Sequence, residues 1–326
     1  MSFSKDSLKI DASAESERIQ SFLKETVQKR FRRRGAVVGI SGGVDSAVVF
    51  ALCVRTFGPE RVIALIMPDQ DSSPESEMLA RELAARFGVT PIKEDITGAL
   101  EGFGCYRRRD EAVRRVFPEF DAAKGYKSKI VLPQNLLETG SLNVFKVTVI
   151  TPDGRQMTEK LPLQDYLQIV AASNLKQRSR TAMLYYHAEL NNYAVAGTAN
   201  KNEHDQGFFV KYGDSGVDIK TIGHLYKTQI YQLAEYLGVP DGIRKRTPTT
   251  DTYSAPCTQE EFYFRLPFQT MDLLWYAQET GVPVPEVAAV MGMTEAQVQR
   301  AFADFDAKRR ATAYLGSPAV GIGSGA

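Results

Sequence analysis

The stretch that most constrains this chain is Gly39-Ile40-Ser41-Gly42-Gly43-Val44-Asp45-Ser46, which separates a strand-like segment from a helix-like segment. The β-branched run at 36–38 is typical of a buried strand, and the apolar residues from Ala47 to Leu52 have helical spacing. Paired glycines let the backbone approach an oxyanion closely, and the first N–H groups of a helix point toward such an anion. The stretch therefore predicts a phosphate site at a helix N-terminus.

Asp45 would repel a phosphate on its own, so we expect a divalent cation, Mg²⁺, between the two. A glycine pair alone is also compatible with an ordinary tight turn between strand and helix. The complete pattern Ser-Gly-Gly-x-Asp-Ser is more specific, and it lacks the Gly-Lys-Ser/Thr ending of the Walker loop and the glycine spacing of dinucleotide folds. It resembles the pyrophosphate-binding loop of ATP pyrophosphatases, which cleave ATP between the α and β phosphates and adenylylate a substrate.

The composition of the 326 residues is ordinary for a globular protein, with 43% hydrophobic and 24% charged residues. Forty basic and 39 acidic residues give a net charge of +1, which predicts neither a nucleic-acid partner nor a membrane partner. Cys53, Cys105 and Cys257 are isolated, so neither a disulfide framework nor a zinc site is expected, and Cys53 fits a small core residue. With no apolar stretch at the N-terminus, we expect a cytoplasmic protein.

Strands and helices alternate along the first hundred residues. An amphipathic helix is expected over 13–34, strands over 36–38, 61–67 and 91–96, and a helix over 74–87. This order predicts an α/β fold, with a Rossmann-like parallel sheet covered by helices on both faces. Ligands of such sheets bind beyond the carboxyl ends of the strands, where the glycine loop should lie.

The alternation stops between residues 98 and 163, which we interpret as an insertion or lid within a single domain of residues 1–326. A hairpin is expected over 143–161, with its turn at 152–155. Basic residues between 106 and 129 favour a solvated face over a phosphate or partner site.

The helical pattern resumes after the insertion and continues through most of the C-terminal half. In order, the residues predict a helix from 164, a strand at 193–198, a helix at 225–237, a long loop at 241–265, helices at 266–310 and a flexible tail at 316–326.

A second polar loop, residues 197–203, follows a predicted strand in the same manner as the first. Its side chains should therefore reach the same edge of the sheet, where Glu203 faces Asp45 across one Mg²⁺. Standing alone, Glu203 would be a helix cap or a solvated residue. The glycine loop makes the metal interpretation the stronger one.

Further motifs occur in the order seen in ammonia-dependent NAD synthetases, and the chain resembles that family over about residues 15–97 and 165–265. A weaker similarity lies at 308–310. The motifs are residues 174–180, 197–203, 208–214, Asp218, 223–227 and 248–251. The resemblance implies an adenine nucleotide alpha hydrolase-like fold.

The resemblance also implies roles for individual residues. ATP phosphates would be held by Ser41, Gly42, Gly43 and Ser46, Mg²⁺ by Asp45 and Glu203, further parts of ATP by Thr198, Lys227 and Thr249, and nicotinic acid adenine dinucleotide (deamido-NAD) by Arg178, Lys211 and Asp218. Asp214 matches a residue close to the substrate, and residues 246–261 match a mobile loop over the reaction. The catalytic residues would be Asp45, Lys227, Asp214 and Thr249. Taken singly, Lys227 would fit a surface ion pair equally well.

The implied reaction is amidation of the deamido-NAD carboxylate by ammonia, with ATP cleaved to AMP and pyrophosphate. The family suggests a homodimer, and ammonia would be free or supplied by a separate protein. Three departures from the family pattern leave the identity of the acid substrate undecided. They are the insertion, Gln259 in place of an acidic residue, and Ala307 in place of histidine. The alternatives are a ligase that amidates another carboxylate and a non-catalytic nucleotide-binding module. A tRNA-modifying enzyme shares the glycine loop, but the missing paired cysteines and the neutral charge disfavour it.

Overall fold

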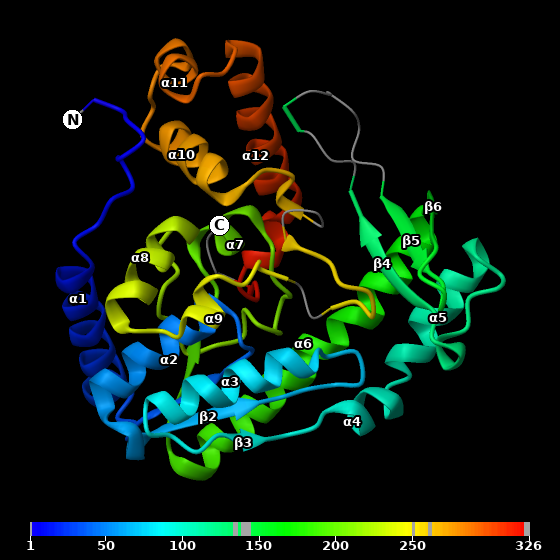
Figure 1. Ribbon diagram of the computed structural model, residues 1–326. Helices are drawn as coiled ribbons and strands as arrows, with labels where there is room; N and C mark the ends of the chain where they lie inside the picture. Colours follow the sequence, from blue (N-terminus) through cyan, green and yellow to red (C-terminus); the bar gives the residue numbers. More distant parts are fainter. Residues whose placement is uncertain (1, 133–135, 138–144, 250–251, 260–262, 323–326) are drawn as a thin grey trace.

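A computed structural model of the protein shows three parts, an α/β layer, a small antiparallel sheet beside it, and a helical C-terminal group (Figure 1). The residues described are 2–132, 136–137, 145–249, 252–259 and 263–322. Several sequence predictions fall partly outside them, namely the start of the 143–161 hairpin, Thr250 and Asp251 of the 248–251 motif, part of the 246–261 loop and the end of the tail.

The α/β layer is a five-stranded sheet in the order β3-β2-β1-β7-β8. Every neighbouring pair is parallel, which confirms the predicted fold class. The strands are β1 (Ala36–Gly39), β2 (Val62–Ile66), β3 (Ile92–Lys93), β7 (Ala194–Gly197) and β8 (Ile219–Lys220). The strand predicted over 91–96 is thus only two residues long, and β8 was not predicted.

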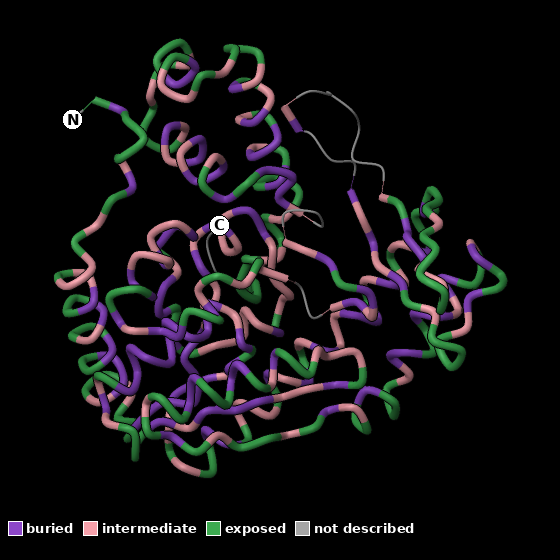
Figure 2. Tube along the Cα trace, in the orientation of Figure 1, coloured by how far each residue is buried: buried purple, intermediate pink, exposed green. Residues whose placement is uncertain are grey.

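Helices cover both faces of the sheet. Successive residues of a strand point to opposite faces, so the apolar strand residues need helices on both. Ala36 and Val38 of β1 pack in one apolar cluster with α2, whereas Val37 packs on the other face with Ala188 of α6. Figure 2 shows the buried residues gathered inside this layer. The layer's helical elements are α1 (Ala12–Lys24), the π-helix η1 (Glu25–Arg30), α2 (Val44–Phe57), the 3-10 turn η2 (Pro59–Arg61), α3 (Pro74–Arg86), α6 (Leu163–Asn191), α7 (Lys201–Gln206), α8 (Lys227–Leu237) and α9 (Asp241–Arg244).

The predicted insertion forms an antiparallel sheet packed on a helix. The predicted hairpin is present as β5 and β6, and an additional strand, β4, pairs with β5. Val147 and Val149 of β5 lie in one apolar cluster with Val113 of α5. The elements of this region are α4 (Thr97–Gly102), α5 (Cys105–Val116), the 3-10 turn η3 (Ala122–Lys124), β4 (Lys127–Val131), β5 (Lys146–Ile150) and β6 (Gln156–Lys160).

The predicted solvated face of basic residues is wrong for one arginine. Arg109 is only 2% exposed, and its guanidinium donates hydrogen bonds to Asp71 and, at 2.8 Å, to Asp110. Lys176 of α6 joins the same cluster, with its Nζ 2.8 Å from Asp71 and 3.0 Å from Asp69. These ion pairs attach α5 to the end of β2.

The C-terminal helices form a core of their own. Trp275 and Phe305 meet edge to face, with ring centroids 5.1 Å apart. The helices are α10 (Phe268–Glu279), α11 (Val284–Met291) and α12 (Glu295–Gly316). Among the described residues, no helix combines the length and the apolar character needed to cross a bilayer.

Candidate active site

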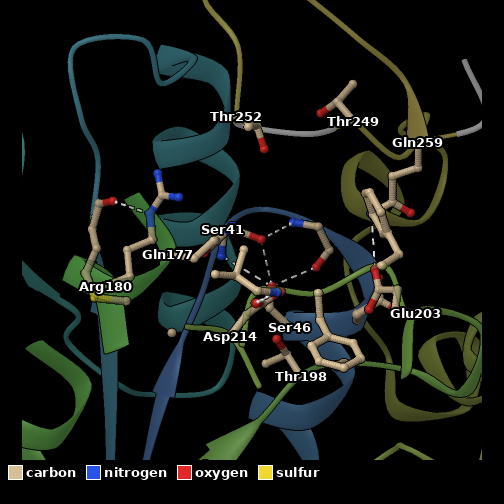
Figure 3. Close-up of a pocket in the computed structure, with 18 of the residues that line it drawn as sticks. Ser41, Ser46, Gln177, Arg180, Thr198, Glu203, Asp214, Thr249, Thr252 and Gln259 are labelled. Carbon is tan, nitrogen blue, oxygen red and sulfur yellow. Dashed lines mark hydrogen bonds between the residues drawn. The ribbon is translucent and has the colours of Figure 1, made fainter. Parts of the chain in front are cut away.

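A cavity of about 910 Å³ lies at the carboxyl ends of β1, β2 and β7. In Figure 3, Thr249, Thr252 and Gln259 lie across it from Ser41 and Ser46. Most of the predicted site residues line it, whereas Gly42 and Asp218 do not. Those that do are Ser41, Gly43, Asp45, Ser46, Arg178, Thr198, Glu203, Lys211, Asp214, Lys227 and Thr249.

The glycine loop joins β1 to α2 as predicted. Ser46 Oγ accepts a hydrogen bond from the Ser41 amide at 3.2 Å and donates one to the Gly43 carbonyl at 3.0 Å, which closes the loop on the first turn of the helix. Gly42 has φ +75°, and a Cβ there would lie 2.6 Å from the Ser76 carbonyl oxygen. Glycine at 42 is therefore required by packing against α3 as well as by backbone conformation.

Asp45 lies between two donors from other elements. One carboxylate oxygen accepts a hydrogen bond from Asn200 Nδ2 at 3.1 Å, and the other accepts one from Lys227 Nζ. Lys227 is 1% exposed. Burial opposes its charge, but the carboxylates of Asp45 and Glu203 outweigh that effect and hold the pKa of Lys227 above its ordinary value. The site thus contains a buried ammonium ion beside the helix N-terminus.

Glu203 both caps its helix and faces the cavity, so the two interpretations of this residue are compatible. Asn200 and Glu203 form a reciprocal capping box at the start of α7. The other Glu203 oxygen accepts a hydrogen bond from Gln259 Nε2 at 3.2 Å. Burial, together with the nearby Asp45 charge, raises the pKa of Glu203 to about 8. A positive charge placed beside these two carboxylates would be stabilised.

The residues matched to deamido-NAD fall into two groups. Arg178 and Lys211 meet at the cavity, where Arg178 Nε donates to the Lys211 carbonyl at 3.3 Å. The Lys211 ammonium donates to the carbonyls of Tyr314 (3.0 Å) and Ser317 (2.9 Å) and lies 4.1 Å from the Tyr314 ring centroid. The end of the chain is therefore in contact with this part of the cavity.

The two aspartates of this region have different positions. Asp214 lines the cavity and accepts a hydrogen bond from the Val210 amide at 2.7 Å, and burial raises its pKa to about 6. Asp218 instead supports the sheet, because its carboxylate accepts hydrogen bonds from the Val195 amide (2.8 Å) and the Tyr185 hydroxyl (3.1 Å). Any effect of Asp218 on a ligand would be indirect in this conformation.

The long loop after α9 reaches over the cavity. Arg246 donates to Ser76 Oγ at 3.0 Å, and Thr249 forms an isolated antiparallel bridge with Thr258. Of the departures from the family pattern, Gln259 is thus part of the site. Ala307 is exposed, and neither it nor Lys308 lines the cavity. Lys308 pairs with Asp304 at 2.7 Å and lies 5.0 Å from the ring centroid of Tyr263, which does line it.

Three polar residues that line the cavity or pack beside it have no role predicted from the sequence. Asp69 and Arg180 line the cavity, 3.0 Å apart. Asp272 of α10 is fully buried and accepts a hydrogen bond from the Thr228 amide at 2.7 Å, at the start of α8 beside Lys227. Asp69 comes just after a buried strand, which indicates from the sequence that it lies at the same edge of the sheet. Nothing in the sequence around Asp272 indicates that it supports the site.

Comparison with known proteins decides the family of this chain. A model of the NAD synthase family matches residues 15–117 and 128–310. The chain belongs to the NAD synthase family. A relative named NH(3)-dependent NAD(+) synthetase from Mesorhizobium japonicum is 52% identical over 308 residues, which cover 94% of this chain and 96% of the relative. The namesake from Rhizobium meliloti is 49% identical, covering 96% and 92% of the two chains.

Solved structures agree on the fold. The NH3-dependent NAD synthetase from Campylobacter jejuni superposes with a TM-score of 0.62 at 23% identity, covering 96% of this chain and 99% of that one. The parallel sheet and the helices on its faces therefore have the fold of an NAD synthetase. The family match omits residues 118–127, which connect α5 to β4, and ends at residue 310, before the segment that contacts Lys211.

Proposed function

We propose that the protein catalyses the ATP-dependent amidation of deamido-NAD by ammonia, giving NAD, AMP and pyrophosphate. The observation that carries this proposal is the convergence of the glycine loop, Lys227 and Glu203 on one cavity, in a chain 52% identical to a relative named NH(3)-dependent NAD(+) synthetase. The protein is accordingly a ligase that forms a carbon–nitrogen bond, with ATP as a substrate.

At the ATP end, the residues supply donors and positive charge. Ser41, Gly42, Gly43 and Ser46 would hold the phosphates through backbone N–H groups and hydroxyls at the start of α2. Lys227 would offset the negative charge on the departing pyrophosphate. Thr198 and Thr249 line the same cavity, where their hydroxyls would contact the nucleotide.

Asp45 and Glu203 would hold Mg²⁺. The donor set fits, because Mg²⁺ is usually bound by one or two carboxylates together with substrate phosphates and water. Among the described residues, no three His, Cys, Asp or Glu side chains gather to form a metal site, so phosphate oxygens would complete the coordination. When bound, the ion would act as a Lewis acid on the phosphates.

The reaction needs no protein nucleophile. The substrate carboxylate attacks the α-phosphorus of ATP, and the bond to the bridging oxygen of pyrophosphate breaks. Ammonia then attacks the acyl carbon of the adenylate, AMP departs, and the nitrogen loses a proton. Asp214, whose pKa burial raises to about 6, would accept that proton.

Arg178 and Lys211 would bind the phosphates of deamido-NAD. Lys211 must then exchange the carbonyls of Tyr314 and Ser317 for the substrate, so the end of the chain would shift on binding. Asp218 would act through the sheet, since it holds the amide of Val195.

We also propose that residues 1–326 form one catalytic domain with the insertion at 98–163, and that two copies form a homodimer in the cytoplasm. Support for the dimer comes from α6, where Leu163, Leu167, Tyr186 and Leu190 are each more than half exposed (71%, 55%, 56% and 67%). Ammonia would be free or delivered by a separate protein.

The test is incubation of the purified protein with ATP, Mg²⁺, ammonia and deamido-NAD, with NAD and AMP measured together. Equal amounts of both are expected. If AMP formed only with another carboxylic acid, the chain would be a related amide-forming ligase. If no acid gave AMP, the cavity would belong to a non-catalytic nucleotide-binding module.

A further inference from the structure

Residues 252–259, which we call the docked segment, connect the cavity to the inserted sheet. Thr252 and Gln259, its two ends, line the cavity. Between them the chain lies beside β4 (Figure 1). This segment belongs to the loop expected to cover the reaction.

The contact with β4 consists of two hydrogen bonds to the backbone of Ser128 at the edge of the inserted sheet. Among the strands that the structure describes, the order is β4-β5-β6, so β4 has a strand partner on one side only. There the Ser128 amide donates to Ser254 Oγ at 2.9 Å, and the Ser128 carbonyl accepts the Ala255 N–H at 3.2 Å. Both backbone groups of Ser128 are thus satisfied by the docked segment, in the manner of a strand edge that receives an added chain.

Apolar packing supports these hydrogen bonds. Tyr253 and Cys257 are 4% and 1% exposed and belong to the same apolar cluster as Phe120, Ile130 and Val147 of the insertion. Tyr253 also lines the cavity. One side chain therefore contacts both the core of the inserted sheet and the reaction space.

The inserted sheet is itself anchored near the catalytic edge. Helix α5 packs on β5 through Val113, and Arg109 on the same helix pairs with Asp71, just beyond β2. Asp71 also binds Lys176 of α6 at 2.8 Å. The sheet therefore has a defined position relative to the glycine loop.

We infer that the inserted sheet is the docking surface that holds the docked segment over the cavity, with Tyr253 and Ser254 as positioning residues. The inference rests on the proposed function. Closure by docking keeps Thr249 and Gln259 over the cavity and keeps water from the acyl-adenylate. When the contact between the docked segment and β4 is weakened, water competes with ammonia for the acyl-adenylate. AMP then accumulates without an equal amount of NAD.

The experiment compares the wild type with the double variant Tyr253→Leu/Ser254→Ala, and measures AMP, NAD and the KM for ATP. Losing two local interactions shifts the open-to-closed equilibrium by about tenfold, so we expect AMP released without NAD to rise by about that factor. The matched control is Thr158→Ala, which also loses a side-chain hydrogen bond, to Thr148 at 2.8 Å, on the strand farthest from the docked segment. It should keep the wild-type ratio of NAD to AMP.

The inference would be overturned if the double variant had the NAD-to-AMP ratio, the KM for ATP and the melting temperature of the wild type. A second measurement is independent of the reaction. Hydrogen exchange of the Ala255 amide should be slow in the wild type and at least about tenfold faster in Ser254→Ala. Unprotected exchange in the wild type would show that the segment does not dock, whatever acid the enzyme amidates. Absence of NAD with intact protection would instead contradict the proposed function.

Discussion

The buried ammonium of Lys227 donates a hydrogen bond to the carboxylate of Asp45, which joins the first turn of α8 to the first turn of α2. The two residues are 182 positions apart in the sequence. Since Asp45 belongs to the glycine loop, this pair places a positive charge where the leaving pyrophosphate is expected.

Replacing Lys227 by methionine keeps much of the side-chain volume and removes the charge. We expect kcat for pyrophosphate release to fall by about 10²–10³-fold, as when one preorganised electrostatic group is lost. The control is Lys245→Met, which removes an exposed lysine that pairs with Asp241 at 2.6 Å. Equal kcat values in the two variants would show that Lys227 has no role in the reaction.

Asp45→Asn tests the proposed metal site. The amide keeps an oxygen that can accept a hydrogen bond but removes the negative charge that Mg²⁺ requires. We expect the Mg²⁺ concentration that gives half-maximal pyrophosphate release to rise at least about tenfold. Titration of Mg²⁺ at saturating ATP measures it. An unchanged Mg²⁺ dependence and rate would remove Asp45 from the metal site.

Arg109→Met tests the buried ion pairs that attach α5 to β2. Removing the arginine leaves the buried Asp110 without its partner and leaves Asp71 with Lys176 alone, which costs about 3–5 kcal/mol in the free energy of unfolding. Arg107→Met is the matched control on the same helix, because Arg107 is exposed and pairs with Glu111 at 2.9 Å. It should cost less than about 1 kcal/mol. Urea unfolding of both variants gives the comparison, and similar losses would contradict the assigned role of Arg109.

Asp272 makes the free energy of unfolding depend on pH in a definite direction. Burial raises its pKa to about 6, although hydrogen bonds from Thr228 and Asn202 and the charge of Lys227 oppose the shift. The folded state therefore holds this proton more tightly than the unfolded state, whose aspartate pKa is about 3.9. The contribution of Asp272 to stability is thus full below about pH 4 and is lost as the pH rises to about 6.

Asp272→Asn should remove that contribution. The unfolding free energy of the wild type relative to the variant should fall between pH 4 and pH 6, by up to about 3 kcal/mol from the size of the shift. Thermal unfolding of both proteins at several pH values measures the difference. A difference that stays constant with pH, or that grows as the pH rises, would contradict the raised pKa.

The local patterns at the glycine loop and at β1, β2 and β7 were sufficient to predict the sheet and its ligand edge, because apolar runs and glycines act over a few residues. β4 was missed for a related reason. Its buried positions, Ser128 and Ile130, alternate with Lys127 and Lys129, so half of the inward-facing pattern is polar. The segment therefore appeared basic and not strand-like.

Residues whose role depends on distant partners were not predictable from the sequence. Arg109 appears solvated among other arginines until the fold brings Asp71 and Lys176 to it. Asp272 lies in a helical stretch far from the loops and reaches Thr228 only through packing of α10 on α8. Gln259, noted as a departure, proves to be a donor to Glu203, where a third carboxylate would add repulsion.

The central claim is that the cavity activates the carboxylate of deamido-NAD for attack by ammonia. The most direct measurement is the stoichiometry of NAD, AMP and pyrophosphate formed from deamido-NAD, ATP, Mg²⁺ and ammonia by the wild-type protein. We predict one NAD and one pyrophosphate for each AMP, with no product when ammonia or deamido-NAD is omitted. AMP and pyrophosphate formed with a different acid, while deamido-NAD gives neither NAD nor AMP, would contradict the account.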